Sequence, residues 1–225
     1  MQPALDVGAG DLEIDLCGER LVLLPEHAAY RPAHRALLVA DPHFGKAAAF
    51  RALGVPVPGG TTAGNLGRLT RLVARTGAES IVFLGDFFHA KQSRAPRTLE
   101  ALAEWREAYP ELRLTLVRGN HDRHAGDPPA ELRITCVDGP LPAAPYAYAH
   151  HPEPAAACYV LAGHVHPSVT LRGAGRQRER LPCFHLGPHV GILPAFGDFT
   201  GTADVSVIPG DRVYVVAGEQ VVPAV

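Results

Sequence analysis

The sequence has almost no lysine and no excess of positive charge. Lysine occurs only at Lys46 and Lys91, and 21 basic residues stand against 23 acidic ones, which gives a net charge of −2. A chain with this balance lacks the global basic field that attracts long nucleic acids. The charged fraction of 20% and the apolar fraction of 47% are typical of an ordinary globular protein.

Paired cysteines and long apolar runs are also missing. The four cysteines form no Cys-x-x-Cys pair, which favours reduced thiols over a disulfide framework or a zinc site. No apolar run approaches the ~20 residues that a membrane-spanning helix needs. Residues 1–15 have neither the basic start nor the long apolar stretch of a secretory signal. We therefore expect a cytoplasmic protein without a membrane partner.

The apolar pattern predicts a layered α/β protein. Residues 12–24 alternate around Gly18, as a hairpin does. Short apolar runs predict strands at 37–40, 81–84, 112–117, 146–149 and 159–162. Helical spacing predicts one helix capped by Thr61 or Thr62 and another at about 96–109. This order favours a sheet packed between helices or on another sheet, in a single domain over 1–225.

Side chains that bind metal ions follow most of these predicted strands. They are Asp41, His43, Asp86, Asn120, His150, His164 and His166. Residues i and i+2 of an extended segment point the same way, so Asp41 and His43 can reach one ion, and His164 and His166 repeat this geometry. Carboxylate, amide and imidazole ligands together suit manganese, iron or zinc better than calcium. Seven such residues predict two adjacent divalent ions, an arrangement that attacks phosphate esters.

The series D-x-H, G-D, G-N-H-D, H-x-P and G-H-x-H between residues 41 and 166 resembles the calcineurin-like metallophosphoesterase superfamily. The resemblance implies a four-layer α/β fold, in which a β-sandwich flanked by helices carries the ions at the carboxyl edges of its sheets. It also implies two ligand sets bridged by Asp86: Asp41, His43 and His166 for one ion, and Asn120, His150 and His164 for the other.

A narrower resemblance covers nearly the whole chain. The stretches LLVADPHFGKAAAFRALGVPVPGG, FLGDFFHAK and LPAFGDFTG are similar to the bacterial ligase-associated DNA-damage-response endonucleases. In that family the first motif usually reads A-D-L-H-x-G-K; Pro42 replaces a residue that is no ligand, so we expect little effect. The resemblance implies a DNA-repair endonuclease acting on DNA, expected in single strands, with two Mn²⁺ ions (Fe or Zn as alternatives). It further implies functional association with a DNA ligase and a helicase.

Three residues are candidates for catalysis. His89 completes G-D-x-F-H, which resembles a nuclease pattern of this superfamily. Many phosphatases of the superfamily carry Asp at the position of His89. In this chain, His89 can touch the scissile phosphate or assist the leaving group. An outward-facing His89 without a role is the alternative. We assign His121 as general acid to the leaving oxygen or as a phosphate contact, with Asp122 orienting its ring.

Several other residues have weaker signals. His151 is expected to point away from its neighbour, because consecutive strand residues face opposite sides. His185, His189 and residues 193–201 either shape the rim of the site or form a covering loop. The basic run 172–180 is a solvated hairpin tip or a polyanion contact. Weaker candidates for nucleic-acid contacts are Arg51, Arg94, Arg97 and Arg123.

Two other functions remain open at this point. A phosphatase or cyclic-nucleotide phosphodiesterase acting on a small substrate would use the same ions. A non-catalytic scaffold, like the phosphoesterase-like subunit of retromer, would keep the fold for protein binding. Such scaffolds normally lose ligands or the histidine of G-N-H, and here each position is filled.

Overall fold

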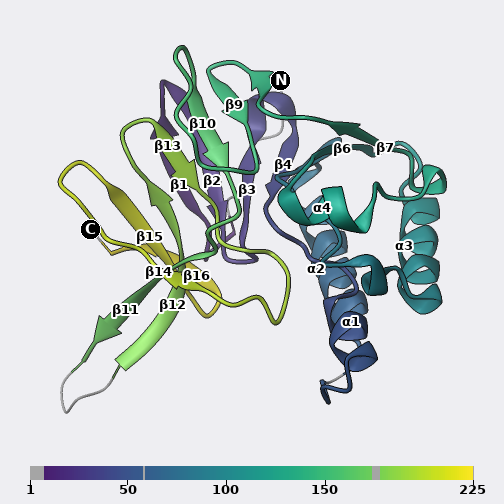
Figure 1. The fold of residues 1–225 in the computed structure, drawn as a ribbon. Coiled ribbons are helices and arrows are strands. Elements are labelled where there is room, and N and C mark those ends of the chain that lie inside the picture. Colours follow the sequence, from purple (N-terminus) through teal and green to yellow (C-terminus); the bar gives the residue numbers. More distant parts are fainter. Residues whose placement is uncertain (1–7, 58, 174–177, 225) are drawn as a thin grey trace.

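The computed structural model describes residues 8–57, 59–173 and 178–224. Two β-sheets pack face to face, and the helices lie on the outer side of the first sheet (Figure 1). The first sheet runs in the order β1 (Leu12–Leu16), β2 (Glu19–Leu24), β3 (Ala28–Arg31), β4 (Ala36–Val39), β5 (Ser80–Phe83), β6 (Arg113–Val117) and β7 (Ile134–Val137). Strands β1 to β4 are antiparallel, and β4 to β7 are parallel.

The second sheet is built from later parts of the chain. Its central strands β13 (Val190–Ile192), β10 (Tyr159–Ala162) and β9 (Tyr146–Tyr148) are parallel neighbours. The remaining strands are β8 (Leu141–Ala143), β11 (Pro167–Arg172), β12 (Arg178–Leu186), β14 (Ala203–Asp204), β15 (Arg212–Ala217) and β16 (Gln220–Pro223). Strands β11 and β12 form the hairpin that the basic run predicted, although residues 174–177 lie outside the described part.

The helices all come from the first two thirds of the chain. They are α1 (Lys46–Ala52), α2 (Thr61–Thr76), α3 (Pro96–Ala108) and α4 (Asn120–Ala125), with short 3₁₀ turns at Pro32–His34, Lys91–Arg94 and Ala130–Leu132. Among the described residues, none of these helices is long and apolar enough to cross a membrane.

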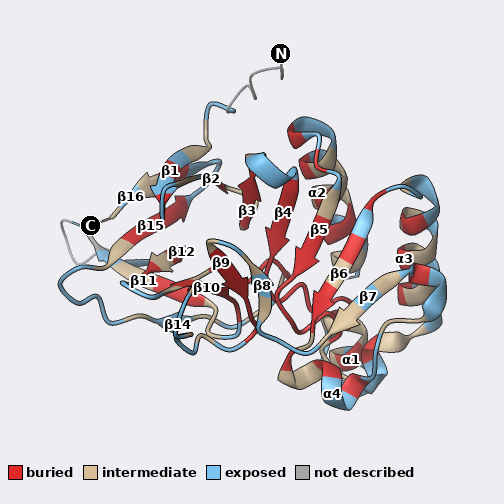
Figure 2. Cartoon of the chain, turned by 90° about the horizontal axis from the view of Figure 1, so that it is seen from above, coloured by how far each residue is buried: buried red, intermediate tan, exposed pale blue. Residues whose placement is uncertain are grey.

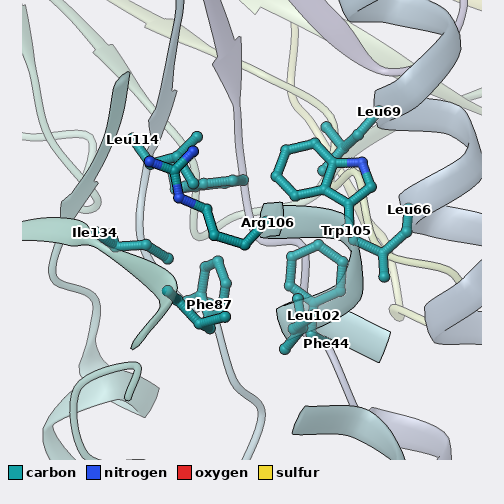
Figure 3. A pocket seen from close by; sticks show the side chains of 11 residues that line it. Phe44, Leu66, Leu69, Phe87, Leu102, Trp105, Arg106, Leu114 and Ile134 are labelled. Carbon is teal, nitrogen blue, oxygen red and sulfur yellow. The ribbon is translucent and has the colours of Figure 1, made fainter. Parts of the chain in front are cut away.

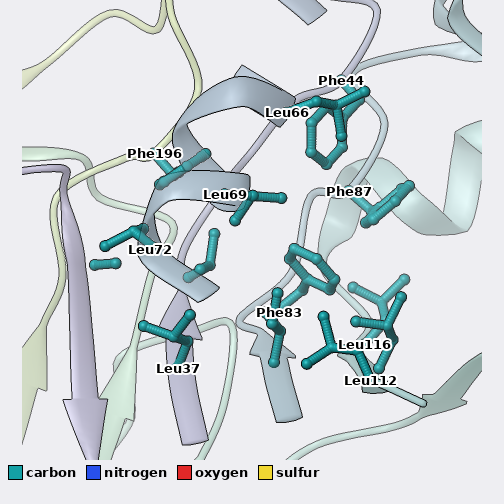
Figure 4. Close-up of a cluster of buried hydrophobic side chains, with 14 of the residues drawn as sticks. Leu37, Phe44, Leu66, Leu69, Leu72, Phe83, Phe87, Leu112, Leu116 and Phe196 are labelled. Atoms are coloured by element: carbon teal, nitrogen blue, oxygen red, sulfur yellow. The ribbon is translucent and has the colours of Figure 1, made fainter. Parts of the chain in front are cut away.

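Alternation along the first sheet divides the core in two. In β4, Leu37 and Val39 point to the helices, whereas Leu38 points to the second sheet. The strands of this region are therefore buried on both faces (Figure 2). Leu66, Leu69 and Leu72 of α2 cover the helix-side cluster at helical spacing, as Figure 4 shows.

Two buried arginines serve the framework. Arg31 is 2% exposed and joins the two sheets, because its guanidinium donates to the Glu19 carboxylate, to Ala143 O at 3.0 Å and to the Tyr148 hydroxyl at 3.1 Å. Arg106 donates to the carbonyls that follow α3, including Leu112 O at 2.9 Å. It lines a hollow of about 10 Å³ under that helix (Figure 3), about the least room that one water molecule needs. This hollow belongs to the core.

The predicted β-sandwich flanked by helices is confirmed (Figure 1), with two differences. A fourth layer is not found among the described residues, because every helix there precedes residue 133 and covers the first sheet. The predicted threonine cap is also wrong: Gly60 precedes α2, and no side chain caps the helix. Thr62 Oγ1 instead accepts a hydrogen bond from Gly45 N at 3.3 Å. The single domain stays a prediction.

Candidate metal centre

The candidate ligands converge because they follow strands that end at the same edge. Strands β4, β5 and β6 are parallel neighbours, and Asp41, Asp86 and Asn120 come two or three residues after their last residues. His150 and His164 follow β9 and β10, which are parallel neighbours in the second sheet. Since the carboxyl ends of parallel strands meet at one edge, both sheets deliver these side chains to one place.

The first cluster consists of Asp41, His43 and His166, whose candidate ligand atoms all lie within 4.8 Å of one another. His166 Nε2 lies 3.6 Å from Asp41 Oδ2. His43 Nε2 lies 3.9 Å from Asp86 Oδ2, which connects this cluster to the next. Asp41 and His43 are buried, so the first cluster is largely shielded from solvent.

The second cluster surrounds the Nε2 atom of His150. This atom lies 2.8 Å from Asn120 Oδ1, 3.0 Å from His164 Nδ1 and 3.5 Å from Asp86 Oδ1. Asp86 therefore presents Oδ1 to the second cluster and Oδ2 to the first. The structure brings together all seven residues that the sequence analysis singled out, and their role as metal ligands stays a prediction.

The donor atoms of both clusters fit divalent cations. Asp41 Oδ1 and His166 Nε2 are buried, and no described residue gives them a hydrogen-bond partner. Buried polar atoms without a partner lower the stability of the fold unless a ligand such as a cation binds them. The ring nitrogens on the far side are held by carbonyls: His150 Nδ1 donates to Leu84 O at 3.0 Å, and His166 Nδ1 to Gly201 O at 2.9 Å. Such bonds direct the other nitrogen of each ring toward a metal.

Burial sets the protonation of these groups. It lowers the pKa values of His43, His150 and His164, which favours the neutral rings that bind metals. For His166 burial acts the same way, but the Asp41 carboxylate, whose Oδ2 lies 3.6 Å from Nε2, favours the protonated ring and raises the pKa above its ordinary value. Burial, and then the Asp41 charge, raise the pKa of Asp86 to about 6. In the absence of a cation, the nearby charge of Asp41 therefore disfavours ionisation of Asp86.

The backbone around the centre is strained. Ten described residues other than glycine have a positive φ, and five of them are candidate ligands: Asp41, His43, Asp86, His164 and His166. A positive φ is uncommon for such residues, and it concentrates at functional sites where the surrounding structure enforces it. At Gly85, with φ +85°, a Cβ atom would lie 2.1 Å from His150 Nδ1. Only glycine therefore fits beside this ligand.

His121 and His89 form a pair of rings beside the bridging carboxylate. Nδ1 of His121 donates to His89 O at 2.6 Å, and its Nε2 lies 3.9 Å from Asp86 Oδ2. The rings of His89 and His121 stack at 4.8 Å, and His89 lies 5.2 Å from the His43 ring. The alternative of an outward-facing His89 is thus wrong. The far side of His89 stacks on Phe50 at 6.0 Å.

The expectation that Asp122 orients the His121 ring is wrong. The Asp122 carboxylate instead accepts hydrogen bonds from the backbone N–H groups of Asp86, Phe87 and Gly119 at 2.8 to 2.9 Å. These N–H groups have no backbone partner among the described residues of the loops, and the carboxylate satisfies them. Asp122 therefore joins the loop after β5 to the start of α4. The ring of His121 is oriented by the His89 carbonyl, so Asp122 acts on the loops.

His151 does not point away, as the alternation of strand residues predicted. It follows the end of β9, where the chain is no longer a strand, so the alternation does not apply. Its ring lies 4.4 Å from the His164 ring, and it groups with His150 and His164 as a candidate ligand set. The residue is exposed, so it forms the outer wall of the second cluster.

The rim is built from residues 193–201. Phe196 N donates to Ala40 O at 2.8 Å, Gly197 N donates to Asp41 O at 3.1 Å, and Gly201 O holds His166. His185 and His189 join neither cluster; His185 Nε2 pairs with Asp211 Oδ2 at 2.7 Å. Of the weaker arginines, Arg94 donates to Asp127 O at 2.7 Å and so holds the loop after α4.

Lys46 is a residue of the site that the sequence analysis gave no role. It starts α1. Burial lowers the pKa of its ammonium, and the charges of Asp86 and Asp41 oppose this shift only in part. Its ammonium also lowers the pKa of His89, after the larger effect of burial, to about 4. The signal was present in the sequence, since G-K directly follows D-x-H-x.

Comparisons with known proteins cover the family, curated sequences and solved structures. The sequence model of the calcineurin-like phosphoesterases matches residues 34–187. The crystal structure of Pseudomonas putida nuclease MPE is 46% identical, covers 95% of this chain and 99% of its own, and superposes with a TM-score of 0.85. Yfce, a phosphoesterase from E. coli, is 13% identical over 81% of this chain and 88% of its own, with a TM-score of 0.35. No curated protein matches the chain.

Proposed function

The chain belongs to the calcineurin-like phosphoesterase family, whose members are metal-dependent hydrolases, and we propose that it is a DNA endonuclease that cuts single strands. The observation that carries the choice of substrate is the likeness to a nuclease over 95% of the chain. The His89 and His121 rings beside Asp86 support the same choice, because they offer a long phosphodiester contacts beyond the ions.

Seven side chains would hold two divalent ions in this proposal. Asp41, His43 and His166 would hold one ion, Asn120, His150 and His164 would hold the other, and Asp86 would lie between them. Such a pair supplies a hydroxide nucleophile at neutral pH and neutralises the charge that develops on the phosphate. The mixed oxygen and nitrogen donors favour Mn²⁺, with Fe and Zn as the alternatives that metal exchange would test.

His121 would protonate the leaving oxygen. A carbonyl only accepts, so the bond to His89 O places one proton on Nδ1 and leaves Nε2 as the atom that gives and takes a proton at the site. His89 is held between the His121 and Phe50 rings, a position from which it can contact the scissile phosphate. Asp122 keeps both loops in place and takes no part in proton transfer.

The biological setting is part of the same proposal. The whole-chain resemblance to ligase-associated endonucleases supports a role in DNA repair, in functional association with a DNA ligase and a helicase. We place this activity in the cytoplasm.

Cleavage of circular single-stranded DNA with Mn²⁺ tests the proposed function, because a circle has no ends and only an endonuclease opens it. A phosphomonoester and a cyclic nucleotide are assayed beside it, and His89→Ala and His121→Ala serve as site variants. We expect the wild type to open the circle and both variants to lose that activity. An intact circle together with rapid turnover of either small ester would refute the nuclease and indicate a small-substrate enzyme.

A further inference from the structure

A hollow of about 390 Å³ lies between α1, α2 and α3, separate from the metal clusters. Arg51 of α1 and Arg97 of α3 line it, together with the hydroxyl-bearing residues Thr61, Thr62 and Thr98. Its volume falls within the range of ligand pockets. The three helices lie on the same side of the first sheet (Figure 1). We refer to this feature as the Arg51–Arg97 hollow.

The Arg51–Arg97 hollow is chemically suited to an anion. It carries two guanidinium groups, and none of the described residues that line it is acidic. This local excess of positive charge contrasts with the net charge of −2 of the whole chain. Arg51 Nη1 also donates to Val57 O at 3.4 Å, which holds its side chain near the loop after α1. Guanidinium forks match the geometry of phosphate oxygens, and threonine hydroxyls add further donors.

Helix α1 connects this hollow to the metal centre. Lys46 at its start interacts with the charges of Asp86 and Asp41, and Phe50 stacks on His89. Arg51 follows Phe50 directly, and the helical rise places it about 7.5 Å further along the axis than Lys46. The same helix therefore carries a ring that stacks on His89 and a guanidinium that lines the hollow.

We propose that the Arg51–Arg97 hollow binds a backbone phosphate of a single-stranded nucleic acid whose scissile phosphate lies at the metal centre. This inference rests on the nuclease function proposed above and deepens it. It gives a chain with a net charge of −2 a local positive site for a polyanion, formed by Arg51 of α1 and Arg97 of α3. It also separates long substrates, which reach the hollow, from small esters, which occupy only the metal centre.

The test compares two substrates in three proteins. The proteins are the wild type, the double variant Arg51→Ala/Arg97→Ala and the control Arg71→Ala, which removes an exposed arginine of α2 outside the hollow. Each is assayed with Mn²⁺ on a single-stranded oligonucleotide over a range of salt concentrations and on bis(4-nitrophenyl) phosphate. Hydrolysis of the small diester reports whether the fold and the metal centre are intact.

For the double variant we expect the KM for the oligonucleotide to rise about tenfold or more. The dependence of log KM on log salt should weaken by roughly 0.7 for each lost phosphate contact, while the small diester is turned over as by the control. An oligonucleotide KM and salt dependence equal to those of Arg71→Ala would overturn the inference and leave the nuclease function standing. Equal loss of both activities would overturn it too, since the arginines would then be structural. A wild type that hydrolyses only the small diester would refute the nuclease function, and the inference with it.

Discussion

Replacing Gly119 by alanine should damage the candidate metal centre and spare the fold. Gly119 has φ −95° and ψ −177°, an extended conformation that alanine adopts without strain. Its Cβ atom would, however, lie 2.2 Å from Asp86 Oδ1, 2.7 Å from the Asp86 backbone N and 2.9 Å from His150 Cε1. Non-bonded heavy atoms require about 3.5 Å, so the Asp86 carboxylate and the loop backbone that carries it must retreat by roughly 1 Å.

A shift of roughly 1 Å is about five times the ~0.2 Å tolerance of ligand distances in a metal site. We expect the affinity for Mn²⁺ at the clusters that Asp86 joins to fall by about 10–100-fold, and phosphodiester turnover to fall by about 10²-fold. Calorimetric titration with Mn²⁺ measures the first effect, and hydrolysis of a small diester measures the second.

Gly64→Ala is the matched control for this substitution. Gly64 is an exposed residue of α2, and the nearest atom to its Cβ would be Asp198 Oδ2 at an ordinary 3.8 Å. Alanine there should leave the metal centre unchanged and stabilise the helix by about 0.5–1 kcal/mol. If Gly119→Ala bound two ions with wild-type affinity, the reasoning that places Asp86 between the ions would be refuted.

Three further outcomes are expected. His121→Ala should slow phosphodiester hydrolysis by roughly 10²–10⁴-fold while the metal content, measured by elemental analysis, stays unchanged; near-normal turnover would exclude the general-acid role. Burial raises the pKa of Asp86 from 3.8 to about 6, so the metal-free protein should lose unfolding free energy as the pH rises between these values. Mn²⁺ requires the ionised carboxylate and should therefore bind more weakly as the pH falls through about 6. Thermal melts with and without Mn²⁺ at pH 4.5 and 7 measure this. An increase in melting temperature on adding Mn²⁺ that is equal at the two pH values would contradict it. Arg31→Met should lower the unfolding free energy, measured in urea, by about 3–5 kcal/mol, because it leaves the half-buried Glu19 carboxylate without its partner. The control Arg20→Met, at an exposed ion pair, should change it by at most about 1 kcal/mol. Equal effects would contradict the role of Arg31 between the sheets.

The sequence predicted the strands that carry the candidate site, and the physical reason is their burial. A strand covered on both faces, such as β4 with Leu37 and Leu38 on opposite sides, must be a continuous apolar run. Polar residues that immediately follow such runs gather at the carboxyl edge of their sheet, so Asp41, Asp86 and Asn120 could be placed together from order and spacing. His150 and His164 follow strands of the second sheet, and the packing of the two sheets brings the two edges together.

Other elements had no such local signal. Strand β3 contains Arg31, which is compatible with burial only because Glu19 and the second sheet satisfy its charge and donors. Helix α1 has seven residues and begins after Gly45, whose φ is +74° and where a Cβ atom would lie 2.1 Å from Ser93 O, so tertiary structure requires glycine there. Propensity and periodicity do not report such long-range partners.

The residues around the candidate ligands were harder to predict than the ligands. Asp122 accepts hydrogen bonds from backbone N–H groups of two loops, and these bonds depend on where the loops meet. His151 turns toward His164 because the strand has ended before it. In both cases the loop geometry decides what the side chain contacts, and the sequence pattern describes only the neighbouring strands.

Anomalous diffraction at the manganese edge, from crystals grown with Mn²⁺, tests the central claim most directly. The account predicts two ions about 3.5–4 Å apart, with Asp86 between them. One ion should contact Asp41, His43 and His166, and the other Asn120, His150 and His164. A single ion, or a second ion held by His151 in place of Asn120, would contradict the binuclear centre described for this chain.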